Sequence, residues 1–186
     1  MSDNEQIFSR GKIFELVHLE QDDGRIFEVA RRVPGVRLII HDEAAGKVLL
    51  TKEYRRELDE WDYRLPGGKM FDSLDEFEAF RTSSDDIVEI AKVKAIDEAQ
   101  QEAGVEIAKL EFFKKSVLGA TVEWDLYVFE ATEWQLSVEG QELEVGEKIE
   151  ADNWATYDEA RTMALNGSMA EERSALILLQ WLEEKV

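Results

Sequence analysis

Apolar runs in the first third of the chain predict β-structure. Residues 12–20 and 25–33 are rich in β-branched and aromatic side chains and flank an Asp-Gly pair, which favours a tight hairpin turn. Residues 36–41 and 47–54 follow as a second pair, and their nearly continuous apolar sequence is typical of strands buried on both faces. We therefore expect an N-terminal antiparallel hairpin followed by two central strands.

The spacing of apolar positions then changes to that of a helix. Residues 87–103 form the clearest helical segment, with Ser84 or Asp85 as the expected N-cap and Gly104 at its end. Further strands are expected over 110–117, 124–131 and 149–157, and helices over 158–165 and 170–184, the last with Leu176, Leu179 and Leu182 toward the core. This order predicts an α/β domain with a mixed β-sheet and helices on its faces.

Length and composition limit the class of protein. The 186 residues, 44% of them hydrophobic, suffice for one packed domain rather than two. A formal net charge of −20 repels phosphate backbones and argues against duplex nucleic acid as a partner. The chain has no apolar run long enough to span a membrane, no signal-peptide pattern at its start and no cysteine, so we expect a cytoplasmic protein. Because cysteine is absent, any metal ligand should be an oxygen atom or a histidine.

The helix over 87–103 carries a pair of carboxylates on one face. Glu98 and Glu102 are one turn apart, with Gln101 beside them, whereas small residues on another face would let the helix lie close to a sheet. Mg²⁺ in proteins is often held by one or two carboxylates together with substrate phosphates. The alternative is an ordinary solvated helix surface, and the context decides between the two.

That context resembles the Nudix hydrolase family. Its signature runs Gly, five residues, Glu, seven residues, then Arg-Glu-aliphatic-any-Glu-Glu-any-Gly-aliphatic. Gly68 supplies the opening glycine, and Glu89 stands where the isolated Glu belongs. The later positions are matched in register by Glu98, Glu102, Gly104 and Val105.

Wider features resemble the ADP-ribose pyrophosphatase branch of that family. They are Glu53-Tyr54-Arg55-Arg56, the segment from Trp61 to Gly68, and Gly167 followed by residues 173–182. The resemblance implies a Nudix α/β/α sandwich, Mg²⁺-dependent hydrolysis of a pyrophosphate bond and a homodimer. It divides the chain into an N-terminal β extension over 1–34, able to form a dimer contact, and a Nudix-like domain over 35–186.

The resemblance also assigns roles to individual residues. Glu98 and Glu102 would be metal ligands and catalytic residues, with the Gly68 carbonyl and the Gln101 side chain beside them at the metal. A glutamate in a late loop helps to activate water in that branch. The loop over 139–150 offers Glu142, Glu144 and Glu147, of which we favour Glu147.

Two residues of the helix depart from the signature. Asp97 replaces the family Arg, so it cannot orient a carboxylate and adds a negative charge beside Glu98. Gln101 replaces the first Glu of the Glu-Glu pair and brings a neutral oxygen only. We therefore expect weaker metal binding than with a complete signature, unless Asp97 or a nearby loop supplies the missing carboxylate.

A third departure is an insertion over about 69–88, 20 residues where the family has five. The stretch is polar and acidic, but Leu74, Phe77 and Phe80 predict at least one helical turn. Three aromatic residues of the insertion, Phe71, Phe77 and Phe80, would form a lid over a base, close a dimer contact, or pack on one another as part of a surface helix.

Arginines stand out in so acidic a chain. Guanidinium groups suit bidentate phosphate binding, so Arg55, Arg56 and Arg37 are candidates for diphosphate contact, although ion pairs with nearby acids are the alternative. Trp61 and Trp124 are candidates for stacking on a base, with anchoring of a core or interface as the alternative.

These residues and the family resemblance together predict a Mg²⁺-dependent pyrophosphohydrolase, with Mn²⁺ as the alternative ion. Its substrate would be a small nucleoside diphosphate derivative of the ADP-ribose or nucleotide-sugar type. The rival hypothesis is a Nudix-fold nucleotide-binding or regulatory module that has lost catalysis, and it is motivated by Asp97 and Gln101.

Overall fold

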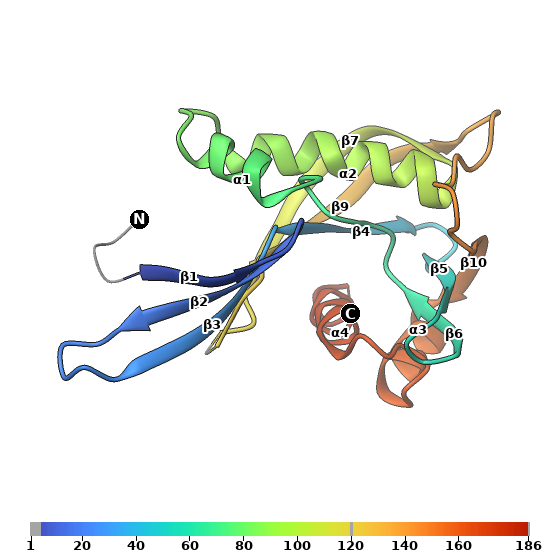
Figure 1. Cartoon of the computed structure of the whole chain (residues 1–186). Helices are drawn as coiled ribbons and strands as arrows, with labels where there is room; N and C mark the ends of the chain where they lie inside the picture. Colours follow the sequence, from blue (N-terminus) through green and yellow to red (C-terminus); the bar gives the residue numbers. More distant parts are fainter. Residues whose placement is uncertain (1–4, 120, 186) are drawn as a thin grey trace.

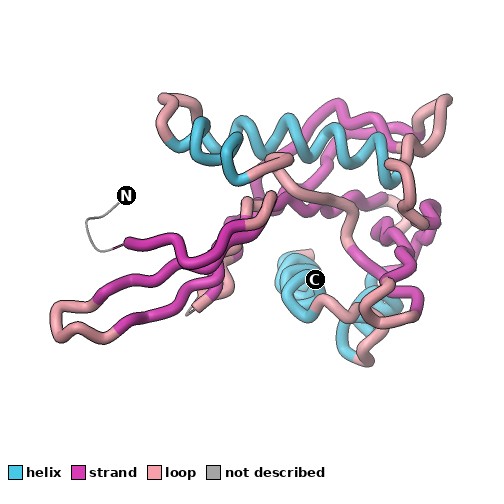
Figure 2. Tube along the Cα trace, viewed as in Figure 1, coloured by secondary structure: helices cyan, strands magenta, loops and turns pink. Residues whose placement is uncertain are grey.

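A computed structural model describes residues 5–119 and 121–185 of the chain. Its described part contains two β-sheets and four helices, and one sheet projects away from the rest of the molecule (Figure 1 and Figure 2). None of the helices in this part combines the length and apolarity that a bilayer crossing requires.

The projecting sheet is built on the predicted hairpin. Strands β2 (Phe14–Glu20) and β3 (Ile26–Arg32) pair antiparallel, and Gly24 adopts a φ of 78° in the turn between them. The sheet order is β1-β2-β3-β8, in which β1 (Glu5–Arg10) and the short β8 (Val122–Glu123) were not predicted. The N-terminal hairpin is thus confirmed, and it is the middle of a larger sheet.

A six-stranded mixed sheet forms the centre of the molecule. Its order is β10-β5-β4-β9-β7, and β6 pairs with β5. The strands are β4 (Gly35–Asp42), β5 (Lys47–Arg55), β6 (Glu60–Arg64), β7 (Val105–Ser116), β9 (Leu126–Leu136) and β10 (Ile149–Thr156). Strand β4 runs parallel to β9 and is buried along nearly its whole length, as its apolar sequence predicted.

Helices cover both faces of this sheet, so the predicted α/β class with a mixed sheet is confirmed (Figure 1). Helix α2 (Ile87–Ala103) packs a row of alanines on one face, where small side chains allow close approach. On the other face lie α3 (Tyr157–Leu165) and α4 (Glu172–Glu184).

Two local expectations were wrong. The N-cap of α2 is Asp86, whose carboxylate accepts the Val88 amide at 2.8 Å, rather than Ser84 or Asp85. In α4, Leu176 is 56% exposed, and the buried residues include Ile177, Leu178, Trp181 and Leu182. The core-facing side of α4 thus contains Leu182, as expected, but it does not contain Leu176.

The insertion contains helix α1 (Leu74–Arg81), in agreement with the predicted helical turn. The Ser73 side chain accepts the Glu76 amide and begins the helix. The Phe71 ring lies 5.3 Å from that of Phe77 and 5.4 Å from that of Phe80. The three aromatics therefore pack on one another, which is one of the arrangements expected for them.

Candidate active site

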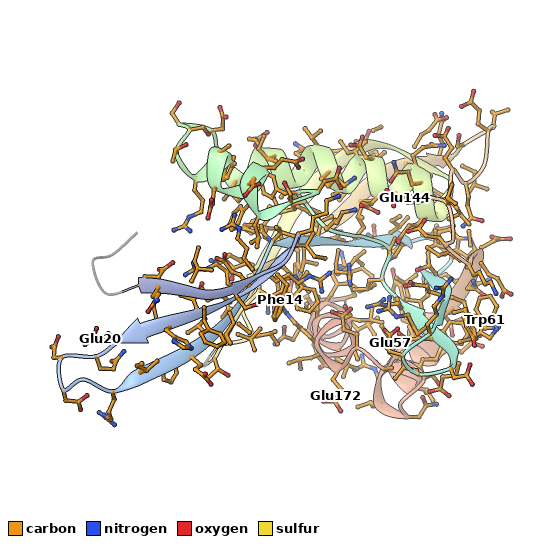
Figure 3. The ribbon with its side chains drawn as sticks, in the orientation of Figure 1. Phe14, Glu20, Glu57, Trp61, Glu144 and Glu172 are labelled. Atoms are coloured by element: carbon orange, nitrogen blue, oxygen red, sulfur yellow. The ribbon has the colours of Figure 1, made fainter. Side chains whose placement is uncertain are left out.

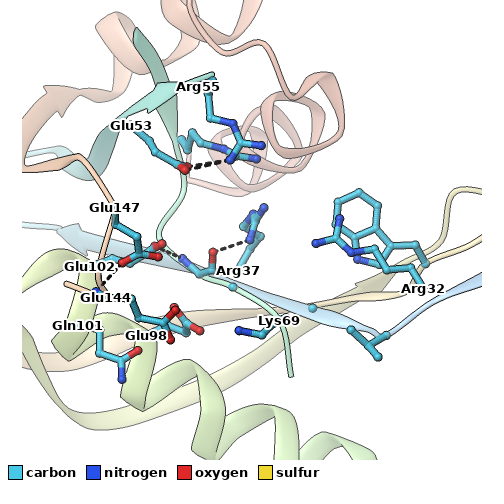
Figure 4. A pocket seen from close by; sticks show the side chains of 16 residues that line it. Arg32, Arg37, Glu53, Arg55, Lys69, Glu98, Gln101, Glu102, Glu144 and Glu147 are labelled. Carbon is cyan, nitrogen blue, oxygen red and sulfur yellow. Dashed lines mark hydrogen bonds and ion pairs between the residues drawn. The ribbon is translucent and has the colours of Figure 1, made fainter. Parts of the chain in front are cut away.

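A cleft of about 230 Å³ lies where α2, the turn after β6 and the ends of the central strands meet (Figure 4). Carboxylates from α2 and from the late loop line one end. Arginines from β3, β4, β5 and β6 line other parts of the cleft, together with Glu53, Lys69 and Trp124. The cleft can therefore present acidic oxygens and guanidinium groups to one ligand.

Two glycines bring the backbone against the α2 carboxylates. The Gly67 amide donates to the Glu102 carboxylate at 2.7 Å, and its φ of 139° is a conformation that favours glycine. A Cβ on Gly67 would overlap the Val36 carbonyl, and a Cβ on Gly68 would overlap the Glu98 carboxylate. The Gly-Gly turn is thus required for this close approach.

The proximity and burial of these carboxylates perturb their protonation. Burial raises the pKa of Glu102 to about 8, against the opposing hydrogen bond from Gly67. Burial also raises the pKa of Glu98, although Lys94 at 3.3 Å acts in the opposite direction. Negative charge at Glu98 and Glu147 adds to these shifts. A cation in the cleft would offset the cost of ionising the pair.

The donor set suits a cation that keeps most of its water. Glu98 and Glu102 supply two carboxylates, while the Gly68 carbonyl already accepts the Val36 amide at 2.9 Å. Within residues 5–119 and 121–185, no three His, Cys, Asp or Glu side chains are grouped closely enough to hold a metal. Mg²⁺ is commonly held by one or two carboxylates with water and phosphate, so the two that are present fit that ion.

A buried ion-pair network forms another wall of the cleft. The Glu171 carboxylate accepts from Arg37 at 3.0 Å, from Arg64 at 2.9 Å and from the Ser174 hydroxyl at 2.8 Å. Burial alone would raise the pKa of Glu171, but the two guanidinium groups outweigh it and lower the pKa to about 2. Arg64 also donates to Glu53 at 2.9 Å.

The structure brings most of the predicted site residues to this cleft. Those that line it are Gly68, Glu98, Gln101, Glu102, Glu147, Arg37 and Arg55. The Glu147 carboxylate is in the exposed loop and accepts the Glu144 amide at 2.8 Å. Arg55 donates to Glu53 and Glu57, so the ion pairing considered as the alternative is present in the structure.

Arg56 and Trp61 do not line the cleft. Alternate residues of a strand point to opposite faces, so Glu53 and Arg55 share the cleft side, whereas Tyr54 faces away. Trp61 lies opposite Tyr54 in the strand register, with ring centroids 5.8 Å apart, and it is at the outer edge of the molecule (Figure 3). Arg56 is exposed beyond the end of β5.

Several residues at the site were not selected from the sequence. Arg32, Glu53, Arg64 and Lys69 line the cleft, and Glu171 lies directly behind it. Trp124, a candidate for base stacking, and Glu144, one of the three glutamates that the late loop offered, also line the cleft. Glu171 is 134 residues from its partner Arg37, so no spacing in the sequence could reveal the pair. For Trp124, the position before a strand was the available signal, and it could not separate a cleft residue from a core residue.

Comparisons with known proteins inform the fold. No family model matches the sequence, and no curated protein matches it. The structure is similar to a solved crystal structure of an ADP compounds hydrolase, with a TM-score of 0.66, 18% identity, and coverage of 98% of this chain and 94% of that one. The chain therefore has the same α/β fold as that hydrolase. Membership of the Nudix family stays a prediction.

Proposed function

We propose that the chain is a Mg²⁺-dependent hydrolase of nucleoside diphosphate derivatives, such as ADP-ribose or a nucleotide sugar. One observation carries the proposal: Glu98 and Glu102 are packed against the Gly67-Gly68 turn at one end of a cleft that four arginines and a lysine also line. The similarity in fold to a protein described as an ADP compounds hydrolase supports it.

Each part of the cleft has a task in this proposal. Glu98 and Glu102 would hold the ion, with the Gly68 carbonyl and Gln101 beside it. When bound, Mg²⁺ or Mn²⁺ would offset the charge of the phosphate oxygens. Glu147, on the exposed loop, would accept a proton from the attacking water. Arg55 and Arg37 would contact the diphosphate.

The test is a turnover assay on a panel of nucleotide sugars, dinucleotides and triphosphates with Mg²⁺ or Mn²⁺, read by chromatography. Glu102→Gln should reduce turnover at least roughly 100-fold while the protein stays folded. Glu133→Gln is the matched control, because it makes the same change at an exposed site outside the cleft. Unchanged turnover of Glu102→Gln in excess Mg²⁺ would refute the assignment.

The rival function is a nucleotide-binding module without catalysis. The observation in its favour is the incomplete carboxylate set, since Gln101 lines the cleft where the resemblance expects a charged residue. Such a module would bind members of the panel and release them unchanged. Sustained product formation by the wild-type protein would exclude it.

We also propose a homodimer formed through the N-terminal extension, residues 1–34. The projecting sheet exposes large apolar side chains, with Phe8 64%, Ile26 60% and Phe27 43% exposed. Sedimentation velocity should give a dimer for the wild-type protein, and Phe27→Asp should shift it toward monomer. Arg25→Asp, on the exposed turn of the same hairpin, is the control. A wild-type monomer at all concentrations would refute this proposal.

A further inference from the structure

Arg32 differs from the other arginines of the cleft. Arg37 and Arg64 share Glu171, and Arg55 pairs with Glu53. Across the described ranges 5–119 and 121–185, by contrast, no carboxylate forms an ion pair with Arg32. Its Nε is buried without a hydrogen-bond partner, as are those of Arg37 and Arg64. Arg32 is therefore a cation of the cleft whose donors are left for a ligand.

An aromatic platform fixes the position of this guanidinium. The Arg32 Cζ lies 4.5 Å from the centroid of the Trp124 ring, a cation–π arrangement. Arg173 donates to the backbone carbonyls of Trp124 at 2.7 Å and of Ser116 at 2.5 Å, and its guanidinium lies 5.2 Å from the centroid of the Trp124 ring. The Arg32 guanidinium group is thus held in place before any ligand arrives.

This arrangement is unfavourable without an anion. Burial lowers the pKa of Arg32, and the positive charge of Arg37 adds to the effect, while Glu171 offsets it only in part. An anion placed at Arg32 would relieve both the lost hydration and the repulsion.

We propose that Arg32 binds a phosphate group of the ligand at the end of the cleft opposite Glu98 and Glu102, with Trp124 as its positioning residue. Figure 4 shows Arg32 across the cleft from those two carboxylates. Arg32 also borders a second cavity of about 620 Å³, so a phosphate at this point can carry a group that extends beyond the cleft. The inference rests on the proposed function, because it assumes a ligand with phosphate groups.

Calorimetry with inorganic pyrophosphate, ADP and adenosine tests the proposal without requiring turnover. The wild-type protein should bind pyrophosphate and ADP more tightly than adenosine, and Arg32→Ala should weaken ADP binding roughly 10- to 100-fold. Arg25→Ala, which removes an exposed arginine paired with Asp23, controls for net charge and should leave affinity within about twofold. Arg55→Ala should have a smaller effect than Arg32→Ala, because Arg55 is already paired.

Two further measurements separate a binding role from a structural one. Trp124→Leu should weaken ADP binding, and Trp124→Phe should restore part of it. Arg32→Gln should leave the melting temperature unchanged or raise it, because an unpaired buried charge is removed, whereas a structural role requires it to fall. If Arg32→Ala does not fold, Arg32→Gln serves for the binding test as well.

The outcomes distinguish this proposal from the proposed function. Equal ADP affinity in Arg32→Ala and Arg25→Ala, or no binding of pyrophosphate and ADP by the wild-type protein, would overturn the role of Arg32. The titrations are made both in EDTA and in Mg²⁺. If Mg²⁺ does not change ADP affinity, or if no member of the substrate panel is turned over, the result counts against the proposed function alone. The loss of ADP affinity in Arg32→Ala would still be measured in EDTA.

Discussion

Replacing Glu171 by Gln tests the ion-pair network behind the cleft. The carboxylate is only 16% exposed and lies between Arg37 and Arg64. Its pKa falls from 4.5 to about 2, which corresponds to about 3 kcal/mol of stability. Glu171→Gln keeps the shape of the side chain but removes the charge, so the variant should be about 3 kcal/mol less stable at pH 7.

The pH dependence of this loss has a defined sign. Because the folded pKa lies below the unfolded value, the stabilisation is complete above the unfolded pKa of 4.5 and is lost as the pH falls toward 2. The difference between wild type and variant should therefore shrink to about 1 kcal/mol near pH 3.

Urea unfolding at a series of pH values measures this difference directly. Glu172→Gln is the matched control, because Glu172 is the exposed neighbour at the start of α4 (Figure 3) and should change stability by less than about 1 kcal/mol. A Glu171→Gln effect equal to that of the control at pH 7, or one that does not change with pH, would refute the reasoning.

The remaining predictions concern the glutamate pair and the Gly-Gly turn. Glu102 has a pKa of about 8 and must lose a proton to bind Mg²⁺, so the apparent Mg²⁺ affinity should rise as the pH increases toward 8. Calorimetry in buffers of different ionisation enthalpy should detect the released proton. An Mg²⁺ affinity that does not change with pH would contradict this prediction. Ionising Glu102 in the folded state costs stability as the pH rises from 4.5 through 8, so without metal at pH 9 Glu102→Gln should be at least about 1 kcal/mol more stable than wild type in urea unfolding. Gly67→Ala should destabilise the fold by about 3 kcal/mol or prevent folding, because its Cβ meets the Val36 backbone at a φ of 139°, and a wild-type melting temperature would count against this reading. Gly68→Ala meets only the movable Glu98 side chain, so it should fold and lose Mg²⁺ affinity, and full retention of that affinity would argue against a metal at this turn.

Local sequence was sufficient where one segment carries its own physical signal. The continuous apolar run over 36–41 predicted β4, because a strand covered on both faces needs apolar side chains at every position. Gly104 marked the end of α2, since the φ of 63° at that point favours glycine. The same pattern was less informative at residues 60–64, where a polar edge strand pairs with β5 and has no apolar run to reveal it.

The local sequence of a helix does not always determine which of its faces is turned toward the core. The apolar residues of α4 are so numerous that more than one face fits a core, and packing against the sheet selected the face containing Leu178 and Trp181 and left Leu176 exposed. The three phenylalanines around α1 were also open to several arrangements, and the structure shows that Phe71 packs on Phe77 and Phe80.

The helix spacing of Glu98 and Glu102, and a glycine turn ahead of them, were determined by the sequence alone, because both are properties of a few consecutive residues. The tertiary structure decided their chemistry. Folding places Glu102 against Gly67 and Glu98 against Gly68, and burial raises the pKa of Glu102. It also brings Glu171 to arginines more than 100 residues away and leaves Arg32 without a carboxylate partner in the described part of the chain. Desolvation and ion pairing depend on which distant side chains share a space, and no pattern along the chain contains that information.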